Sequence, residues 1–246
     1  MKWFLLAMMF FSQQVYALKI VSTSPAITEM IKLLDEEKSL VAVSDYCKSE
    51  LPKVGSSLDL NIEKVALLKP DWVLVQKSSS VKVIENLKKA QIPYLELELI
   101  RLADIERAFF KIATLLKKNE YAEQIFQSER AKVTKSKIEK RVVIVLGDDG
   151  RGAQWSVASN NTLYSDIIEV LGHKNAFPGE NGKYLLLGPE EILKLNTDVF
   201  VFLTNAIETG LFKNKKAKLI FIGNDLAQIP SPQIYTFIQE LGERLK

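Results

Sequence analysis

Residues 63–75 read EKVALLKPDWVLV, and residues 190–202 read EEILKLNTDVFVF. Aligned at a constant offset of 127 residues, they place similar residues at equivalent positions: Glu63 with Glu190, Val65 with Ile192, Leu68 with Leu195, and Asp71 with Asp198. Each copy has the pattern of a short amphipathic helix, a turn that carries Asp, and an apolar strand. We interpret the pair as an internal repeat. It predicts a chain of two similar lobes with one cleft between them, a shape suited to binding a ligand.

The sequence around each copy alternates short apolar strands with helices. Strands are expected at 18–22, 40–43, 72–76 and 94–97, and the Ser24-Pro25 pair is typical of a helix start. A second block begins with a strand at 141–146 and ends with a helix at 232–245. This alternation predicts an α/β fold with parallel sheets covered by helices on both faces.

The segment that joins the two blocks has a different composition. Residues 102–140 contain neither Pro nor Gly, and apolar residues recur at helical spacing, with a break near Lys118-Asn119. We expect two helices here, the second forming a stiff connector. The predicted boundaries are an N-terminal α/β lobe at 18–118, a connecting helix at 119–140 and a C-terminal α/β lobe at 141–246.

The first 17 residues have the pattern of a secretory signal peptide. Lys2 precedes nine apolar residues, Trp3 to Phe11, and Val15-Tyr16-Ala17 places small residues where a signal peptidase reads. Nine apolar residues are too few to span a bilayer, which needs about 20. We expect cleavage after Ala17 and a soluble, monomeric, periplasmic protein. Its single cysteine, Cys47, lies far from the cleavage site and has no partner for an internal disulfide.

Composition and motifs argue against several functions. The formal net charge is only +3 over 246 residues, with Lys and Glu interspersed, which does not favour nucleic acid or an acidic membrane surface. One His, His173, and one Cys cannot form a typical zinc site, and we expect His173 in a surface turn. The enzyme alternative that remains is an exported carboxylate-dependent enzyme using Asp148 and Asp149, which follow a predicted strand.

Four segments carry a resemblance to a known family: KIVSTSPAITEMIKLL (19–34), SDYC (44–47), KVGSSLDLNIEKVALLKPDWVLV (53–75) and LYSDIIEVLGHKNAF (163–177). They resemble periplasmic substrate-binding proteins of the cobalamin and iron-siderophore class, closest to the cobalamin-binding members. The resemblance implies two Rossmann-like lobes joined by a long rigid helix, the class III architecture. It also implies capture of cobalamin or a related corrinoid, without a cofactor or a bound metal of its own, and delivery to the permease dimer and ATPase of an ABC importer.

The resemblance assigns five residues. Glu63 in NIEKV and Glu190 in GPEEI match the acids that dock on permease arginines, and Tyr46, Trp155 and Tyr184 match or lie near aromatic positions that hold a corrinoid. The short loop after Cys47, and Ser57 where cobalamin binders can carry Trp, depart from the pattern. The alternatives within the class are a ferric siderophore, which Arg151 and Lys183 near the cleft would favour, and heme. Trp72 is expected in a buried strand.

Overall fold

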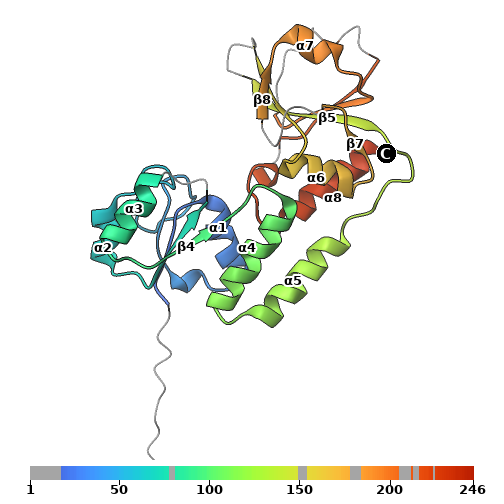
Figure 1. Ribbon diagram of the computed structural model, residues 1–246. Coiled ribbons are helices and arrows are strands. Elements are labelled where there is room, and N and C mark those ends of the chain that lie inside the picture. The colour runs from blue at the N-terminus through green and yellow to red at the C-terminus, as the bar shows by residue number, and fades with distance from the viewer. Residues whose placement is uncertain are drawn as a thin grey trace, which may run out of the picture.

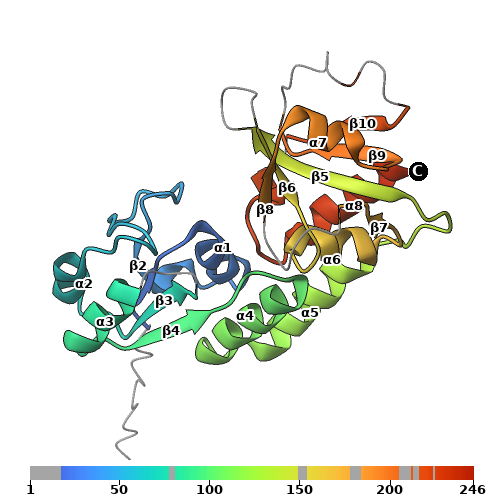
Figure 2. The same ribbon diagram turned by 45° about the horizontal axis from the view of Figure 1, so that its top comes forward.

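The alternating strands and helices form two α/β lobes with a pair of helices against them (Figures 1 and 2). The computed structural model describes residues 18–77, 81–148, 154–177, 184–204, 212, 216–223 and 225–246, leaving aside the side chains of residues 148 and 225. The proposed leader therefore lies outside the described residues. Among the helices in these ranges, none has the length and apolar character needed to span a membrane.

The N-terminal lobe is a parallel sheet in the order β2-β1-β3-β4. Its elements are β1 (Ile20–Ser22), α1 (Pro25–Leu33), the 3-10 helix η1 (Glu37–Ser39), β2 (Leu40–Val43), α2 (Ile62–Leu68), β3 (Trp72–Gln76), α3 (Val81–Lys89) and β4 (Tyr94–Leu97). The side chain of Ser24 accepts from the N–H of Ile27 at 3.4 Å at the start of α1, and Asn61 accepts from Lys64 at 2.9 Å at the start of α2. Both helices thus begin where the sequence predicts.

The C-terminal lobe has a mixed sheet in the order β10-β9-β5-β6-β8, with β7 paired to β5. Its elements are β5 (Arg141–Asp148), β6 (Trp155–Ala158), α6 (Leu163–Val170), β7 (Lys174–Asn175), β8 (Tyr184–Leu187), α7 (Pro189–Lys194), β9 (Val199–Phe202), β10 (Lys218–Phe221), the 3-10 helix η3 (Asp225–Ala227) and α8 (Ile234–Leu245). β6 runs antiparallel to both β5 and β8. The N-terminal sheet is parallel as predicted, whereas this lobe has a mixed sheet, because β6 follows β5 without the helical crossover that parallel pairing needs.

The repeat is confirmed by the hydrogen bonds of its two aspartates. Before β3, the carboxylate of Asp71 accepts from the N–H of Lys19 at 2.8 Å, and the N–H of Asp71 donates to the carbonyl of Lys19 at 2.8 Å. Before β9, Asp198 makes the same two backbone bonds with Arg141, at 2.8 and 2.9 Å. Each aspartate therefore ties the start of its strand to the parallel neighbour. The Arg141 side chain also holds the pKa of Asp198 at about 2.

Two helices form the connector. α4 (Leu102–Leu115) packs against α1 of the N-terminal lobe and α6 of the C-terminal lobe, and α5 (Asn119–Ala131) packs against α4 and α8. α5 runs alongside α4 toward the C-terminal lobe (Figure 2). The predicted helix at 119–140 is too long, because the helical turns end at Ala131. The N–H of Ser136 instead donates to the carbonyl of Leu171 at 2.8 Å, which ties the following segment to the C-terminal lobe.

The largest hydrophobic core crosses from one lobe to the other. It joins Ile27 and Leu74 of the N-terminal lobe to Phe109 of α4 and to Ile144 and Ile238 of the C-terminal lobe. Two smaller clusters fill the outer faces of the sheets, one in each lobe. The connector helices are thus part of the core that the lobes share.

Candidate ligand-binding site

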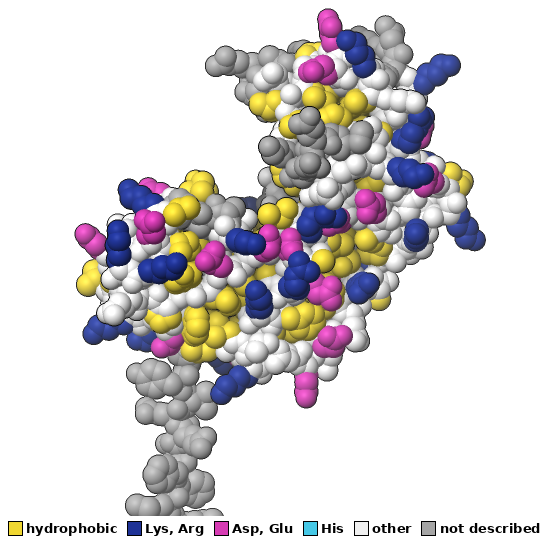
Figure 3. Space-filling model, viewed as in Figure 1, with side chains coloured by type: hydrophobic (Ala, Val, Ile, Leu, Met, Phe, Trp, Pro, Cys, Tyr) yellow, Lys and Arg dark blue, Asp and Glu magenta, His cyan; other side chains and the backbone are white. Residues whose placement is uncertain are grey.

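A cleft of about 370 Å³ lies where the two lobes face each other. Its lining residues come from the start of α1, the loop after β2 and the segment before α8: Pro25, Glu29, Tyr46, Cys47, Lys48, Gln228 and Ile229. The space-filling view shows the recess between the lobes (Figure 3). The cleft volume falls within the range of small-molecule pockets. Of the three predicted ligand-binding residues, the structure places Tyr46 in this lining.

Backbone and side-chain hydrogen bonds hold the Tyr46 loop in place. The N–H of Tyr46 donates to Ser44 Oγ at 3.2 Å, Asp45 accepts from the N–H of Gly55 at 3.0 Å, and Lys53 Nζ donates to the carbonyl of Cys47 at 2.5 Å. The Tyr46 side chain itself is 75% exposed. A firmly held loop with an exposed aromatic ring is suited to pack on the face or edge of a flat ligand.

Cys47 has a different environment from its neighbour. The side chain is 7% exposed, and its Sγ lies 3.3 Å from Thr28 Oγ1, which donates to Ser22 Oγ at 2.8 Å. His173 lies in the other lobe, where its Nδ1 accepts from the N–H of Lys140 at 3.2 Å. Cys47 and His173 therefore lie in different lobes and do not form the Cys–His pair that a cysteine-nucleophile enzyme needs.

His173 is buried, with 4% exposure, so the expectation of a surface turn residue was wrong. It follows the end of α6, and its N–H donates to the carbonyl of Ile168 at 3.0 Å. Burial, and to a lesser extent the positive charge of Lys140, lower its pKa. His173 serves packing and hydrogen bonding within the C-terminal lobe.

Tyr184 is connected to the cleft lining indirectly, by way of a second tyrosine, Tyr164. Its side chain is 45% exposed on β8, and its ring meets Tyr164 edge-on with the centroids 6.1 Å apart. The Tyr164 hydroxyl donates to the carbonyl of Ala227 at 2.7 Å, directly before Gln228 in the cleft lining. Burial raises the pKa of both phenols. Tyr184 itself is not among the lining residues, and its contact with ligand stays a prediction.

Trp155 lies in the core rather than on the cleft surface. It is 4% exposed, stacks on Phe212 with centroids 5.2 Å apart, and meets Phe202 edge-on at 6.1 Å. Its indole N–H has no hydrogen-bond partner among the described residues. Trp72 begins β3, a largely buried strand as expected, while its own side chain is only partly buried and lines a groove beside α4. A ligand-binding role for Trp155 stays a prediction that now has to account for its burial.

Glu63 and Glu190 occupy equivalent exposed positions. Each lies in the first turn of its helix, α2 in the N-terminal lobe and α7 in the C-terminal lobe. The two helices lie at the outer ends of their lobes (Figure 1). Docking through these acids stays a prediction.

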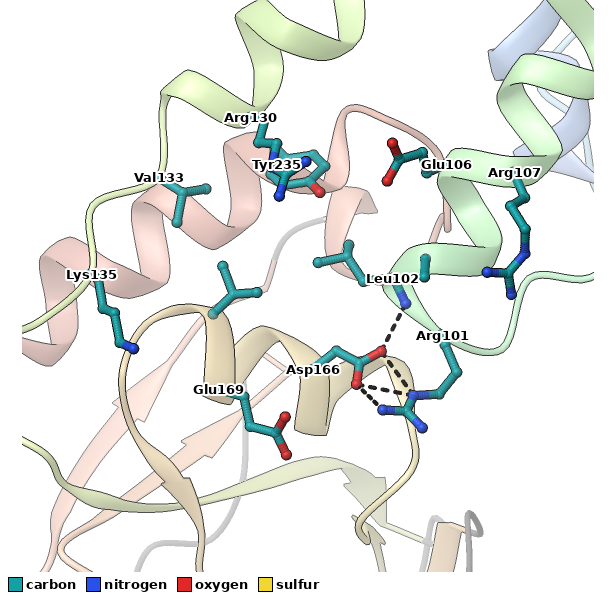
Figure 4. Close-up of a pocket in the computed structure, with 12 residues that line it drawn as sticks. Arg101, Leu102, Glu106, Arg107, Arg130, Val133, Lys135, Asp166, Glu169 and Tyr235 are labelled. Carbon is teal, nitrogen blue, oxygen red and sulfur yellow. Dashed lines mark hydrogen bonds and ion pairs between the residues drawn. The ribbon is translucent and has the colours of Figure 1, made fainter.

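A larger pocket, of about 740 Å³, lies where the connector meets the C-terminal lobe (Figure 4). There, Arg101 at the start of α4 donates from Nε to both carboxylate oxygens of Asp166 on α6, at 3.0 and 2.8 Å, and from a terminal nitrogen as well. Leu102 adds its N–H to Asp166 at 2.9 Å. Because its walls come from α4, α6, α8 and the end of α5, we regard this pocket as part of the joint between lobe and connector, not as the ligand site.

Most residues on which the enzyme and ferric siderophore alternatives depend lie outside the described residues. Asp149, Arg151 and Lys183 are outside the described residues, and of Asp148 only the backbone is described, paired with Trp155 at the end of β5. Within the described ranges, no group of three or more His, Cys, Asp or Glu residues could hold a metal ion.

The sequence alone did not single out Glu29, Tyr164, Gln228 or Ile229. Glu29 carried a signal, as a polar residue within the apolar pattern of the first helix. Gln228 and Ile229 reach the cleft only through the packing of the C-terminal segment against the opposite lobe, which no local pattern indicates.

Two α/β lobes, a shared connector and a cleft between the lobes define a binding protein of the class III type. The chain belongs to the periplasmic binding protein family, whose model matches residues 20–229. This family consists of substrate-binding transport proteins, which confirms the expectation of a binding protein and rules against the carboxylate-dependent enzyme. Its members bind ligands rather than cofactors.

Two relatives cover most of the chain. An ABC transporter substrate-binding lipoprotein of Bacillus subtilis, YvrC, is 26% identical over an alignment of 253 positions, gaps included, that covers 92% of this chain and 79% of the relative. The vitamin B12-binding protein of Pectobacterium carotovorum is 28% identical over 195 residues, covering 73% of this chain and 69% of the relative. The chain is therefore a periplasmic or extracellular substrate-binding protein of an ABC transporter.

Solved structures confirm the fold. The vitamin B12-binding protein BtuF of Vibrio cholerae matches with a TM-score of 0.77 at 18% identity, covering 92% of this chain and 96% of that one. The heme-binding protein HutB of the same organism matches with a TM-score of 0.74 at 20% identity, covering 93% and 99%.

Proposed function

We propose that this protein captures cobalamin or a related corrinoid in the cleft between its lobes and delivers it to the permease of an ABC importer. The observation that carries the proposal is the exposed Tyr46 on a firmly held loop in the wall of that cleft. A large, partly apolar ring is well held by such a rigid aromatic side chain. The vitamin B12-binding relative, whose similarity covers 73% of the chain, supports the same ligand class.

The direct test is the absorbance spectrum of the purified protein after incubation with cobalamin and removal of free ligand. A corrinoid band at one equivalent per chain is expected. The matched variant is Tyr46→Ala, which should lose affinity while keeping the fold, because the side chain is exposed. Absence of a corrinoid band in the wild type would contradict the proposal.

Heme is the second candidate, because heme-binding proteins are among the solved structures of the same fold. Tyr46 in the cleft lining, or Tyr184 near it, would supply a phenolate ligand to ferric iron. The same incubation with hemin separates the two, because a tyrosine-ligated ferric heme has a spectrum of its own. A ferric siderophore, supported only by Arg151 and Lys183, is tested in the same series.

The remaining parts of the proposal concern export and delivery. The first 17 residues serve as a signal peptide cleaved after Ala17, so that the mature chain begins at Leu18, directly before β1. Glu63 and Glu190 dock on basic residues of two permease subunits, one for each lobe. Their equivalent positions and their exposure support this, since exposed charges at an interface rim orient a partner more than they add affinity.

A further inference from the structure

The exposed face of α1 is narrow, and Glu29 lies at its centre. Of the residues from Pro25 to Leu33, only Pro25, Glu29, Lys32 and Leu33 are partly exposed, and the rest are buried. Glu29 follows Pro25 by one helical turn, so the two side chains share a face, and both line the cleft. Among the described residues of that lining, Glu29 is the one acid and Lys48 the one base.

The Glu29 carboxylate has acceptor capacity to spare. One oxygen forms an ion pair with Lys32 Nζ at 3.2 Å, from within the same helix. An ionised carboxylate offers about four lone-pair sites on its two oxygens, so it accepts further N–H donors. Lys32 is not in the cleft lining, and it holds Glu29 from the side of the helix. Gln228, on the opposite lobe, adds an amide to the same cleft.

From this arrangement we infer that Glu29 is a specificity-determining residue that selects ligands with an amide-bearing edge over ligands with a carboxylate-bearing edge. The inference rests on the proposed function and refines it. A corrinoid carries primary amides around its ring, and their N–H groups donate to a carboxylate in strong, charge-assisted hydrogen bonds. A heme carries propionates, which the same carboxylate repels. Rejection by an unfavourable pairing is a common route to specificity.

The test compares ligands that differ in one group. Cyanocobalamin and its three monocarboxylic acids, each with one propionamide hydrolysed to propionate, are titrated against the wild type and Glu29→Gln. The wild type should prefer cyanocobalamin to at least one of the acids by about tenfold or more, the size of one charge-assisted hydrogen bond. Glu29→Gln should reduce that preference to about twofold or less, because a neutral amide both donates and accepts.

The control is Glu37→Gln, which removes the same charge from an exposed position in η1, outside the cleft lining. It should keep the wild-type preference, and the circular dichroism of both variants should match the wild type. An unchanged preference in Glu29→Gln, the same loss in Glu37→Gln, or a wild type without preference would overturn the role of Glu29 and leave corrinoid binding standing. A wild type that binds none of the four corrinoids would overturn the proposed function together with the inference.

Discussion

Arg101 and Asp166 join the connector to the C-terminal lobe through one carboxylate, which accepts from the Arg101 guanidinium and from the N–H of Leu102. Asp166 lies in the first turn of α6, whereas Arg101 precedes α4, so the pair fixes the start of one helix against the other. A planar guanidinium in contact with both oxygens of a carboxylate also fixes orientation, which a single-point ion pair would not do.

The first prediction concerns the energy of this joint. In a double-mutant cycle with Arg101→Ala and Asp166→Ala, the coupling free energy should be about 1–3 kcal/mol, because the Asp166 side chain is largely buried. The exposed pair Lys174–Glu139, at 2.8 Å in the same half of the molecule, is the control and should couple by less than about 0.5 kcal/mol. Urea unfolding of the four proteins of each cycle measures both values. Equal coupling in the two pairs would contradict a structural role for the joint.

The second prediction concerns lobe closure. The connector helices pack on both lobes, and the Arg101–Asp166 joint adds a fixed contact, so we expect little relative motion when ligand binds. The radius of gyration from solution scattering should change by less than about 1 Å between the free and loaded protein. A decrease of several ångströms would show that the lobes close like a hinge.

The third prediction distinguishes the roles of Trp155 and Tyr46, which the sequence analysis both assigned to ligand binding. Trp155→Ala should lower the free energy of unfolding by about 3–5 kcal/mol, because it removes a buried ring packed on Phe202 and Phe212. Tyr46→Ala should leave stability within about 0.5 kcal/mol and weaken corrinoid binding by about 1–3 kcal/mol. Denaturant unfolding and ligand titration of both variants test this. A Trp155→Ala protein with unchanged stability and reduced corrinoid affinity would contradict this prediction and would support a ligand-binding role for Trp155.

Much of the fold could be predicted from sequence because its signals are local. The helix–turn–strand pattern within each copy of the repeat, the start of α1 at Ser24-Pro25 and the apolar strands all depend on neighbours a few residues apart. The end of α5 does not. Residues 132–140 contain no Gly or Pro, yet Val133, Thr134 and Ser136 are weaker helix formers, and the contact of Ser136 with Leu171 holds the segment in another conformation.

The candidate site was predictable only in part. Tyr46 lies in a polar loop, where an aromatic residue has few core partners, and the structure places it in the cleft. Trp155 lies in an apolar strand, where the same residue type serves packing or binding equally well. The partners that surround it, Phe202 and Phe212, come from distant parts of the chain. The sequence around Trp155 does not contain that information.

The fourth prediction tests the docking acids. Reversing Glu63 and Glu190 to Lys should abolish delivery of ligand, because like charges then meet across the interface at a cost of several kcal/mol. Ligand affinity should stay within about twofold, since neither residue lines the cleft. Transport into vesicles that contain the permease and ATPase, with a parallel ligand titration, measures both. Glu85→Lys, exposed on α3, is the control and should transport normally. Normal transport by the double variant would refute the docking role.

The fifth prediction concerns pH. Burial lowers the pKa of His173 below its unfolded value of about 6.5, so the unfolded chain binds the extra proton more readily. The contribution of neutral His173 to stability is therefore present above about pH 6.5 and is lost as the pH falls below it. Urea midpoints between about pH 7.5 and 5 should show this decline, and His173→Gln should flatten it. An identical pH profile in the variant would contradict the assignment.

The hydrophobic core that runs from Ile27 through Phe109 to Ile238 has a consequence for the chain as a whole. In most two-lobed proteins with a narrow linker, each lobe is a candidate folding domain in its own right. Here α4 packs against α1 of the N-terminal lobe and against α6 of the C-terminal lobe, so neither half completes its interior without the other. The two lobes share a repeated helix–turn–strand unit, but their common core predicts one cooperative unit: we expect the molecule to unfold, and to open to proteases, as a single domain.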